Sequence, residues 1–470
     1  MSKTQALGAF FQQILVGNPD GLSVVFYLDL ATPGNNRRPD DGRASQCMYF
    51  TFLELPPWFR SRRNGWIPFS YVLHRDQKQV SLTDSMLVKY MLCIFDSDDS
   101  NLAFGKGFGV HGGDGSIQQV RAKAFLCVAD WDQHAKTFTL KGPNGSVPCW
   151  CCRNVLGHCV WFVDPYLVHV HSHEHERFHN HTTESVNEIM ERLQAIAANG
   201  TNAALKREEQ ATGFKYDPDG LMFDAVARRK MNPPRGIYPD WMHGWVASGG
   251  LAAYECNGLC LFMQSRDVSP EDIDDWVANV KLPSGVSRLS RHFFRNRVVQ
   301  VVGKPMRAFA GEMLTVVMLL GFFLDVFPAP AGDQEWADRR ECFILLRIIL
   351  VILQRGNIGD LPTLRSACRS HSELYKRFYH CIPKLHEVAH VADYWWWWKA
   401  LLSCFGPERH HKLMKRVMGF AYKNAGKTAL AYDIRTWFKN LDLEELYMPT
   451  HLSGKKKIGH GATSQPFLAA

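Results

Sequence analysis

The sequence contains no apolar run long enough to cross a lipid bilayer. Its two most apolar stretches, residues 313–324 and 342–353, span 12 residues each, and Arg347 interrupts the second. A membrane-spanning helix needs about 20 such residues, so both stretches predict buried helices instead. The start of the chain also lacks the basic and apolar segments of a secretion signal. We therefore expect a soluble, intracellular protein with no membrane contact.

A strong charge bias and a disulfide pattern are also missing from the 470 residues. Lys and Arg number 54 against 46 Asp and Glu, which gives a net charge of +8. This modest basic excess is compatible with polyanion binding but does not require it. The 13 cysteines are odd in number, and four of them cluster within residues 149–159: Cys149, Cys151, Cys152 and Cys159. This pattern, beside 20 histidines, favours reduced thiols and a metal over disulfides.

The first 130 residues carry the patterns of a mixed α/β sheet. Four runs of β-branched and aromatic residues predict strands at residues 22–28, 47–53, 66–73 and 120–128. Between the third and fourth runs, apolar residues at helical spacing predict a helix over residues 81–95. The expected order is therefore strand, strand, strand, helix, strand.

Beyond this region the character of the chain changes several times. The expected segments are a core over residues 1–145, a Cys/His-rich segment expected to bind zinc over 146–182, a helical insertion over 183–400, a C-terminal helix region over 401–440 and a basic flexible tail over 441–470. Inside the insertion, the polar residues 200–220 predict a loop.

Two glycine-rich patterns imitate nucleotide-binding motifs. Residues 421–428 fit a permissive P-loop, but a basic helix, rather than the required buried strand, is expected before them. Gly107, Gly109 and Gly112 imitate the dinucleotide fingerprint without an immediately preceding strand. We expect no nucleotide cofactor.

An alternating run of histidines offers a second possible chemistry. His169, His171, His173 and His175 would share one face of a strand and could bind a catalytic metal, as in some hydrolases. A solvated polar loop is the interpretation that we favour. A histidine-metal hydrolase centred on residues 169–181 stays open as an alternative.

Two aspartates each follow a strand that we expect to be buried. Asp29 ends the first strand and Asp130 ends the fourth. If these strands are parallel neighbours, both carboxylates emerge at one edge of the sheet, where they could share Mg²⁺ ions for phosphoryl transfer. Either residue alone is better explained as a turn or N-cap residue. The pair, in this order of elements, favours a metal site.

Five short features of the sequence belong together. They are the strand-end aspartates, Ala129-Asp130-Trp131 with Lys141-Gly142, Cys149-x-x-Cys152, Asp240-Trp-Met-His243 and Gly406-Pro-Glu408-Arg-His-His-Lys412. Together they resemble segments of the eukaryotic DDE/D transposases of the CACTA-type and Plavaka-like group. The resemblance covers most of residues 20–440. It implies an RNase H-like mixed sheet, interrupted by the Cys/His segment and a large, mainly α-helical insertion.

The resemblance also implies roles for particular residues. Glu408 would be the third catalytic acid beside Asp29 and Asp130, holding Mg²⁺ or Mn²⁺, with Glu312 as the rival choice. Asp240 and His243 match the motif found between the second and third acids of such enzymes. The basic residues after Glu408 would contact DNA phosphates; they are Arg409, Lys412, Lys415 and Arg416.

A structural zinc ion is the second expected cofactor. Cys149, Cys152 and His243 are the expected ligands, and the fourth would be His158, Cys159 or one of the later histidines. Asp240 could instead orient His243 rather than contact the ion.

The expected function is phosphodiester hydrolysis and strand transfer at transposon ends by a nuclear, homo-oligomeric transposase. An inactive transposon relic or a domesticated DNA-binding protein is the alternative. The core begins almost at residue 1, so we expect a copy that lacks an N-terminal DNA-binding module.

Overall fold

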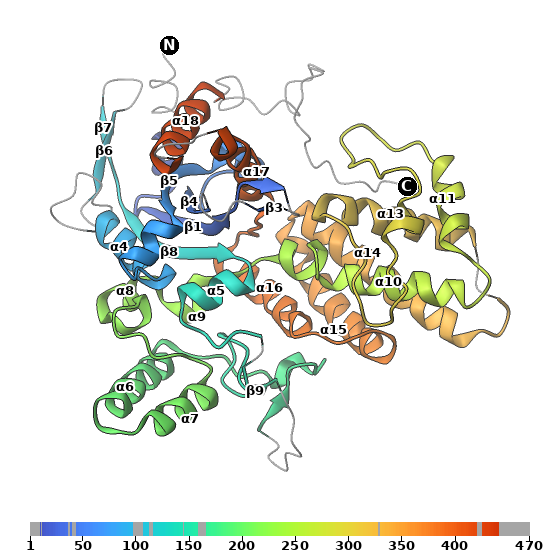
Figure 1. Cartoon of the computed structure of the whole chain (residues 1–470), viewed down its shortest axis with the longest axis horizontal. Coiled ribbons are helices and arrows are strands. Elements are labelled where there is room, and N and C mark those ends of the chain that lie inside the picture. The colour runs from blue at the N-terminus through green and yellow to red at the C-terminus, as the bar shows by residue number, and fades with distance from the viewer. Residues whose placement is uncertain are drawn as a thin grey trace. The chain divides into compact units, whose positions relative to one another are not determined.

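The chain folds into two units (Figure 1). The computed structural model describes residues 10, 12–35, 38–39, 44–96, 107–111, 116–143, 145–157, 166–327, 330–420 and 425–440. Unit 1 holds the described residues of Met1–Gly142, His181–Tyr238 and Ser403–His460, and unit 2 those of Pro143–Asn180 and Pro239–Leu402. Residues 183–238, expected as part of the helical insertion, thus belong to unit 1. The expected basic tail, residues 441–470, lies outside the described residues.

Unit 1 is built on a mixed five-stranded sheet with the strand order β11-β8-β1-β4-β5. Its strands are β1 (Leu22–Ala31), β4 (Ser45–Phe52), β5 (Ile67–Leu73), β8 (Ala122–Ala129) and β11 (Ile237–Pro239). β1 pairs with β4 and β4 with β5 in antiparallel fashion, whereas β1 and β8 run parallel. The expected mixed α/β sheet, with its first and fourth strands as parallel neighbours, is confirmed. β11 is only three residues long and has no pattern that predicted it.

The sheet forms where the sequence predicts it because its central strands are apolar on both faces. Residues 22–28 of β1 are each at most 1% exposed, as expected of a strand covered on two sides. The expected helix is present as α4 (Asp84–Asp96). It begins three residues later than expected, and the Thr83 hydroxyl accepts a hydrogen bond from the backbone N–H of Met86.

Helices complete unit 1. They are α2 (Pro57–Arg60), η2 (Arg63–Gly65), α3 (His74–Gln79), α4, α5 (Trp131–Thr137), α6 (Thr183–Asn199), α7 (Asn202–Thr212), η4 (Leu221–Phe223), α8 (Ala225–Met231), α9 (Pro233–Gly236), α17 (Phe405–Phe420) and α18 (Ala425–Asn440). The prediction of a loop over residues 200–220 is wrong, because α7 lies there. Thr201 caps its start and Gly213, at φ 79°, ends it. Lys141 fastens this helix to the core through an ion pair of 2.6 Å with Glu209.

The described residues also form three two-stranded ladders that are separate from this sheet. They are β2 (Gly34–Asn35) with β3 (Arg38–Pro39), β6 (Phe108–His111) with β7 (Ile117–Val120), and β9 (Val155–Leu156) with β10 (Val168–His169). The dinucleotide-like glycines fall around β6, although Gly112 lies outside the described residues. The P-loop-like residues follow helix α17 rather than a strand, and 421–424 are also outside the description.

Unit 2 is mainly helical. Its elements beyond β9 and β10 are η3 (His175–Arg177), the π-helix η5 (Met242–Val246), α10 (Leu251–Gln264), α11 (Pro270–Ala278), α12 (Phe293–Arg297), α13 (Ala310–Val326), α14 (Gln334–Arg355), η6 (Ile358–Asp360), α15 (Leu361–Phe378) and α16 (Lys384–Trp398). The two apolar stretches seen in the sequence lie in α13 and α14, where most of their side chains are buried. Within the described part of the chain, no helix has the length and apolar character of a membrane span.

Candidate functional site

The parallel pairing of β1 and β8 brings Asp29 and Asp130 to corresponding positions, although β1 continues past Asp29 to Ala31 and does not end before it as expected. Tyr27 lies opposite Val128 in this ladder, so Asp29 and Asp130 occupy corresponding positions two residues further along. Adjacent strands are about 4.8 Å apart. The sheet therefore carries both residues at one edge, as the arrangement of elements predicts.

The two carboxylates have different local partners. Asp29 accepts a hydrogen bond of 2.7 Å from the backbone N–H of Leu30. Asp130 caps helix α5, where its Oδ1 accepts from the backbone N–H of Gln133 at 2.6 Å. Asp130 thus has the N-cap role that an aspartate at a strand end often takes, and it does not join the closest group of ligand atoms around Asp29.

Helix α17 delivers Glu408 to Asp29 from the far end of the chain. The hydroxyl of Tyr27 donates a 2.8 Å hydrogen bond to Oε1 of Glu408 and lies 3.3 Å from Oδ2 of Asp29. Tyr27 and Glu408 are 381 positions apart in the sequence. Tyr27 is 1% exposed, and its burial, together with the two carboxylates, raises the pKa of this phenol well above its ordinary value. The hydroxyl therefore stays protonated and joins the two acids.

The start of α17 approaches the core closely because residue 406 is glycine. A Cβ at Gly406 would lie 2.6 Å from Nε1 of Trp66 and 2.9 Å from the carbonyl oxygen of Arg60. Any other residue would push the helix away from this surface. The glycine two positions before Glu408 therefore helps to place the carboxylate.

His411 completes the group. Ligand atoms of Asp29, Glu408 and His411 lie within 4.8 Å of one another, so these residues could hold a metal ion. Nδ1 of His411 is 3.0 Å from Oδ2 of Asp29, yet neither ring nitrogen has a hydrogen bond among the described residues. Burial alone would raise the pKa of Asp29, but His411 and the N–H of Leu30 outweigh it and lower that pKa.

The basic residues of α17 face outward. Its buried positions include His411, Met414 and Met418, whereas the expected DNA contacts Arg409, Lys412, Lys415 and Arg416 are all exposed. The helix thus presents ligands on its buried side and cations on its exposed side.

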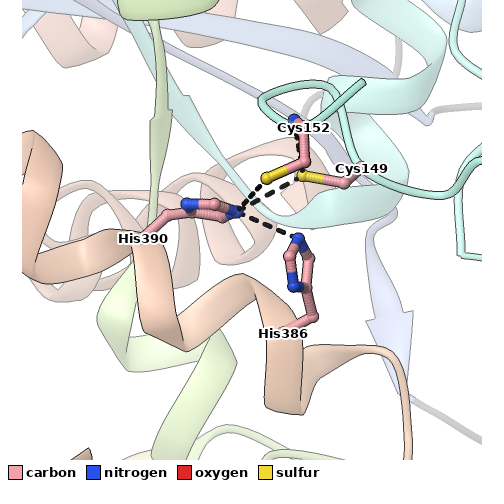
Figure 2. Close-up of side chains that lie close together, drawn as sticks. All are labelled: Cys149, Cys152, His386 and His390. Carbon is pink, nitrogen blue, oxygen red and sulfur yellow. Dashed lines mark hydrogen bonds between the residues drawn. The ribbon is translucent and has the colours of Figure 1, made fainter. Parts of the chain in front are cut away.

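A second group of ligands lies in unit 2 and is fully buried. Cys149, Cys152, His386 and His390 have ligand atoms within 4.8 Å of one another and could hold a metal ion. Figure 2 shows Nε2 of His390 directed at both sulfur atoms and at His386. The separations are 3.4 Å to each Sγ and 3.0 Å to Nε2 of His386. The four residues are at most 5% exposed.

Local structure prepares these four residues for a metal. His386 and His390 are four positions apart on α16 and so share one face of the helix. The backbone N–H groups of Cys151 and Cys152 donate to Sγ of Cys149 at 3.2 and 3.3 Å. Burial opposes ionisation of Cys149, but the hydrogen bond with Cys152 and the two imidazoles hold the pKa of this thiol well below its ordinary value.

Neighbouring side chains support the group. Oδ2 of Asp393 lies 4.0 Å from Nδ1 of His390, beyond hydrogen-bond distance. Sγ of Cys152 is 3.6 Å from Oδ1 of Asn180. Phe178 packs edge-on against His386 with ring centres 4.5 Å apart. These contacts keep solvent away from the sulfur and nitrogen atoms.

His243, which the sequence suggested as a ligand, is not in this group; His386 and His390 occupy the remaining places. His243 instead directs Nδ1 at Oδ2 of Asp240 at 2.6 Å, and its backbone N–H donates to the same oxygen at 3.0 Å. Both residues sit at the start of η5, so the Asp-x-x-His spacing closes a local turn. The other suggested ligands, His158 and Cys159, lie outside the described residues.

The alternating histidines do not form a ligand face. Only His169 lies on the two-residue strand β10, and His175 begins η3. Within the described ranges, no residue from 169 to 181 belongs to a group of three or more close metal ligands. Burial first, and then nearby histidines and other cations, lower the pKa of His171 to about 4 and of His175 to about 3.

Glu312, the rival third acid, lies at the start of α13 in unit 2. Its Oε2 accepts a 2.9 Å hydrogen bond from the backbone N–H of Phe309. This is the helix-start role that the charge of Glu312 suggests in the sequence.

Sequence reasoning did not single out four residues of these groups. Tyr27 could have been found, because it lies two positions before Asp29 and therefore on the same face of the strand. His386 and His390 carry the spacing of two ligands on one helix face, which pairs naturally with Cys-x-x-Cys. His411 has no signal beyond its place three residues after Glu408.

Comparison with models of known protein families and with curated protein sequences finds no match to this chain.

Proposed function

We propose that unit 1 is the metal-dependent, phosphodiester-cleaving core of a DDE/D-type transposase. The observation that carries the proposal is the meeting of Asp29 and Glu408, joined by the buried hydroxyl of Tyr27. Two carboxylates so distant in sequence do not come to share a hydrogen-bond donor through local chain geometry such as a turn or a helix cap. Their shared position is what a cation-binding site needs.

The order of elements supports an RNase H-like arrangement of the sheet. Three antiparallel strands, β1, β4 and β5, are followed by helix α4 and by β8, which pairs in parallel with β1. This order places Asp29 and Asp130 at one edge. Helix α17 brings Glu408, which we propose as the third acid, to the same strand β1.

The donor set fits a hard divalent cation. Carboxylate oxygens suit Mg²⁺ and Mn²⁺, and the imidazole of His411 also suits Mn²⁺. A bound ion would stabilise charge on the attacking and leaving oxygens of a phosphodiester. Asp29 and Glu408 would hold it, while Tyr27 orients the Glu408 carboxylate. For Asp130 to take part, its carboxylate must turn from the N–H of Gln133 towards Asp29.

The exposed cations of α17 suit a DNA substrate. Lys412, Lys415 and Arg416 lie one and two turns beyond Glu408 on the solvent side of the helix. Contacts from such residues to phosphates position a duplex without reading its sequence. Under this proposal the protein acts on nuclear DNA as an oligomer that pairs two transposon ends.

Metal-dependent nicking of supercoiled DNA tests the proposal. We expect nicking with Mn²⁺ or Mg²⁺, its loss with EDTA, and its loss in Asp29→Asn and Asp130→Asn. Asp132→Asn is the matched control, because the side chain of Asp132 is 75% exposed and pairs with Lys136 one turn away. Activity that survives both Asp29→Asn and Asp130→Asn would overturn the assignment. DNA binding without any metal-dependent cleavage would instead favour a relic or a domesticated DNA-binding protein.

For unit 2 we propose a structural zinc ion held by Cys149, Cys152, His386 and His390. Two sulfur and two nitrogen donors are a common tetrahedral zinc set. Bond lengths of about 2.0–2.3 Å would separate ligand atoms by about 3.3–3.8 Å, close to the observed 3.0 and 3.4 Å. All four positions would be filled by protein, which leaves none for a substrate.

A further inference from the structure

A third group of metal-ligand side chains lies in the helical core of unit 2. It consists of Glu255 on α10, Cys342 on α14 and His371 on α15, whose ligand atoms lie within 4.8 Å of one another. All three residues are 0% exposed. No motif joins them, because each comes from a different helix. Only the packing of these helices brings them together.

The polar atoms of this group are incompletely paired. Oε2 of Glu255 and Nε2 of His371 are 2.7 Å apart. The second oxygen, Oε1 of Glu255, and the second nitrogen, Nδ1 of His371, are buried without a hydrogen bond among the described residues. Sγ of Cys342 lies at 4.0 Å from the carbonyl oxygen of His371, the limit of a weak thiol hydrogen bond.

The group therefore leaves one oxygen of Glu255 and one ring nitrogen of His371 without a partner in the described part of the chain. An unpaired charge or polar group in a protein core costs several kcal/mol, on the order of the total stability of a domain.

The positive charge of Arg339 acts on Cys342, but the guanidinium is hydrogen-bonded elsewhere. Arg339, which precedes Cys342 by one turn on α14, is committed to Glu335 at 2.7 and 2.9 Å and lies over the ring of Phe262. Trp245 packs edge-on against His371 with ring centres 5.2 Å apart. The described neighbours of the three ligands thus include an aromatic ring and an arginine that is already paired with Glu335.

We propose that Glu255, Cys342 and His371 bind a zinc ion, separate from the one proposed at Cys149. One oxygen, one sulfur and one nitrogen donor match Zn²⁺ and do not suit Mg²⁺ or Ca²⁺, which prefer oxygen alone. Binding would replace the hydrogen bond of 2.7 Å by a ligand separation of about 3.3 Å, a small movement. One tetrahedral position would remain for a water molecule.

Such an ion would tie three helices of unit 2 together. It would satisfy the Glu255 charge and the Cys342 thiolate at once, and it would link α10, α14 and α15 by metal–ligand bonds. Because the residues are buried, the ion would enter as the helices pack, so that binding and folding are coupled.

Zinc content per chain tests the inference on the full-length protein. We expect two equivalents in the wild type, purified without chelator, and one equivalent in both Cys342→Ala and Glu255→Gln. Cys368→Ala is the matched control with two equivalents, because Cys368 is also buried on α15 and belongs to no close ligand group in the described chain. Cys149→Ser should lose the other equivalent, so the two zinc proposals fail or hold separately.

Replacement of zinc by Co²⁺ allows a second measurement, which does not depend on the number of zinc ions counted per chain. In protein produced with Co²⁺, near-ultraviolet thiolate-to-metal absorption should fall by about one third in Cys342→Ala, because three of the proposed ligands are thiolates. Cys368→Ala should leave the band unchanged. Zinc content and cobalt absorption that are the same in Cys342→Ala as in the wild type, with circular dichroism showing a folded chain, would overturn the proposal.

Discussion

The two candidate sites of this protein differ in ligand type and in access. In unit 1, carboxylates and one histidine meet at the edge of a sheet, where the side chain of Asp29 is 30% exposed. In unit 2, two cysteines and two histidines are enclosed, with Cys152 completely buried. Oxygen ligands with solvent access suit a cation that must exchange water and substrate. Enclosed sulfur and nitrogen ligands suit an ion that stabilises a fold.

The elements that carry the ligands differ in the same way. Asp29 and Glu408 come from a strand end and a helix start that are distant in sequence, and they are joined by a single hydroxyl. The zinc-type ligands come as two local pairs, one in a tight turn and one on α16. We infer that activity should depend on unit 1 and stability on unit 2, and the following predictions test this separation.

The largest expected effect is on activity in Glu408→Gln. Loss of one charged metal ligand should reduce nicking about a thousandfold or more, since several kcal/mol of charge stabilisation are lost. The melting temperature should change little, because glutamine can still accept from Tyr27. Glu312→Gln, measured beside it, should keep full nicking activity. If Glu312→Gln abolished nicking and Glu408→Gln kept it, the third acid would be Glu312, and the group around Asp29 and Glu408 would not be the active site.

The next effect is on stability in Cys152→Ser. Loss of a zinc ligand should lower the free energy of unfolding of unit 2 by several kcal/mol, on the order of the larger losses known for buried metal sites. Urea unfolding followed by tryptophan fluorescence measures it, and a strong chelator should reproduce it in the wild type. Cys127→Ser is the control, a buried thiol of β8 in unit 1 that lies in no close ligand group of the described chain. Equal chelator sensitivity of Cys152→Ser and the wild type would contradict the metal role.

A third effect concerns the metal-independent anchoring of α17 in unit 1. Asp433 of α18 is hydrogen-bonded to Tyr71 and contacts Nε2 of His410, and all three residues are buried. Asp433→Asn should destabilise unit 1 by about 3–5 kcal/mol, because Tyr71 and His410 lose their buried carboxylate partner. The loss should be the same with and without chelator. If the loss of stability in Asp433→Asn depended on chelator, the stability of unit 1 would also depend on a metal, which contradicts the proposed separation between the units.

The smallest effect is on the pH dependence of unit 2. The pKa of His171 is lowered to about 4, first by burial, whereas an unfolded histidine titrates near 6.5. The unfolded chain therefore takes up the proton first, and stability should be full above pH 6.5 and fall as the pH drops towards 4. His171→Asn should show a shallower decline in urea midpoints between pH 7 and 5. If the urea midpoints of the wild type and His171→Asn fell equally between pH 7 and 5, the decline could not be attributed to His171.

Much of the sheet could be predicted from the sequence, because strands buried on both faces appear as continuous apolar runs. The run at residues 22–28 and the one at 120–128 are each found as strands, and the parallel pairing of β1 with β8 follows the expected order. Helix α7 was missed because its sequence is polar; its signals are the caps Thr201 and Gly213. β11 was missed because three residues are too short for a pattern.

The candidate sites were predictable only in part. Asp29, Glu408, Cys149 and Cys152 stand out by their neighbours in the sequence, and the structure places each in a ligand group. Their partners were harder to find. Cys152 meets His390 across 238 positions, and the spacing of either residue says nothing about the distance between them.

The sequence by itself determined the local features of this protein. Strand and helix periods, caps and the i, i+4 histidine pair follow from the sterics and hydrogen bonds of neighbouring residues. Only the tertiary structure decided which of these features meet. It brought His411 beside Asp29, put His386 and His390 in the place expected for His243, and joined Glu255, Cys342 and His371 without any motif. Contacts of this kind depend on how whole faces pack, and packing is a property of the folded chain rather than of any segment.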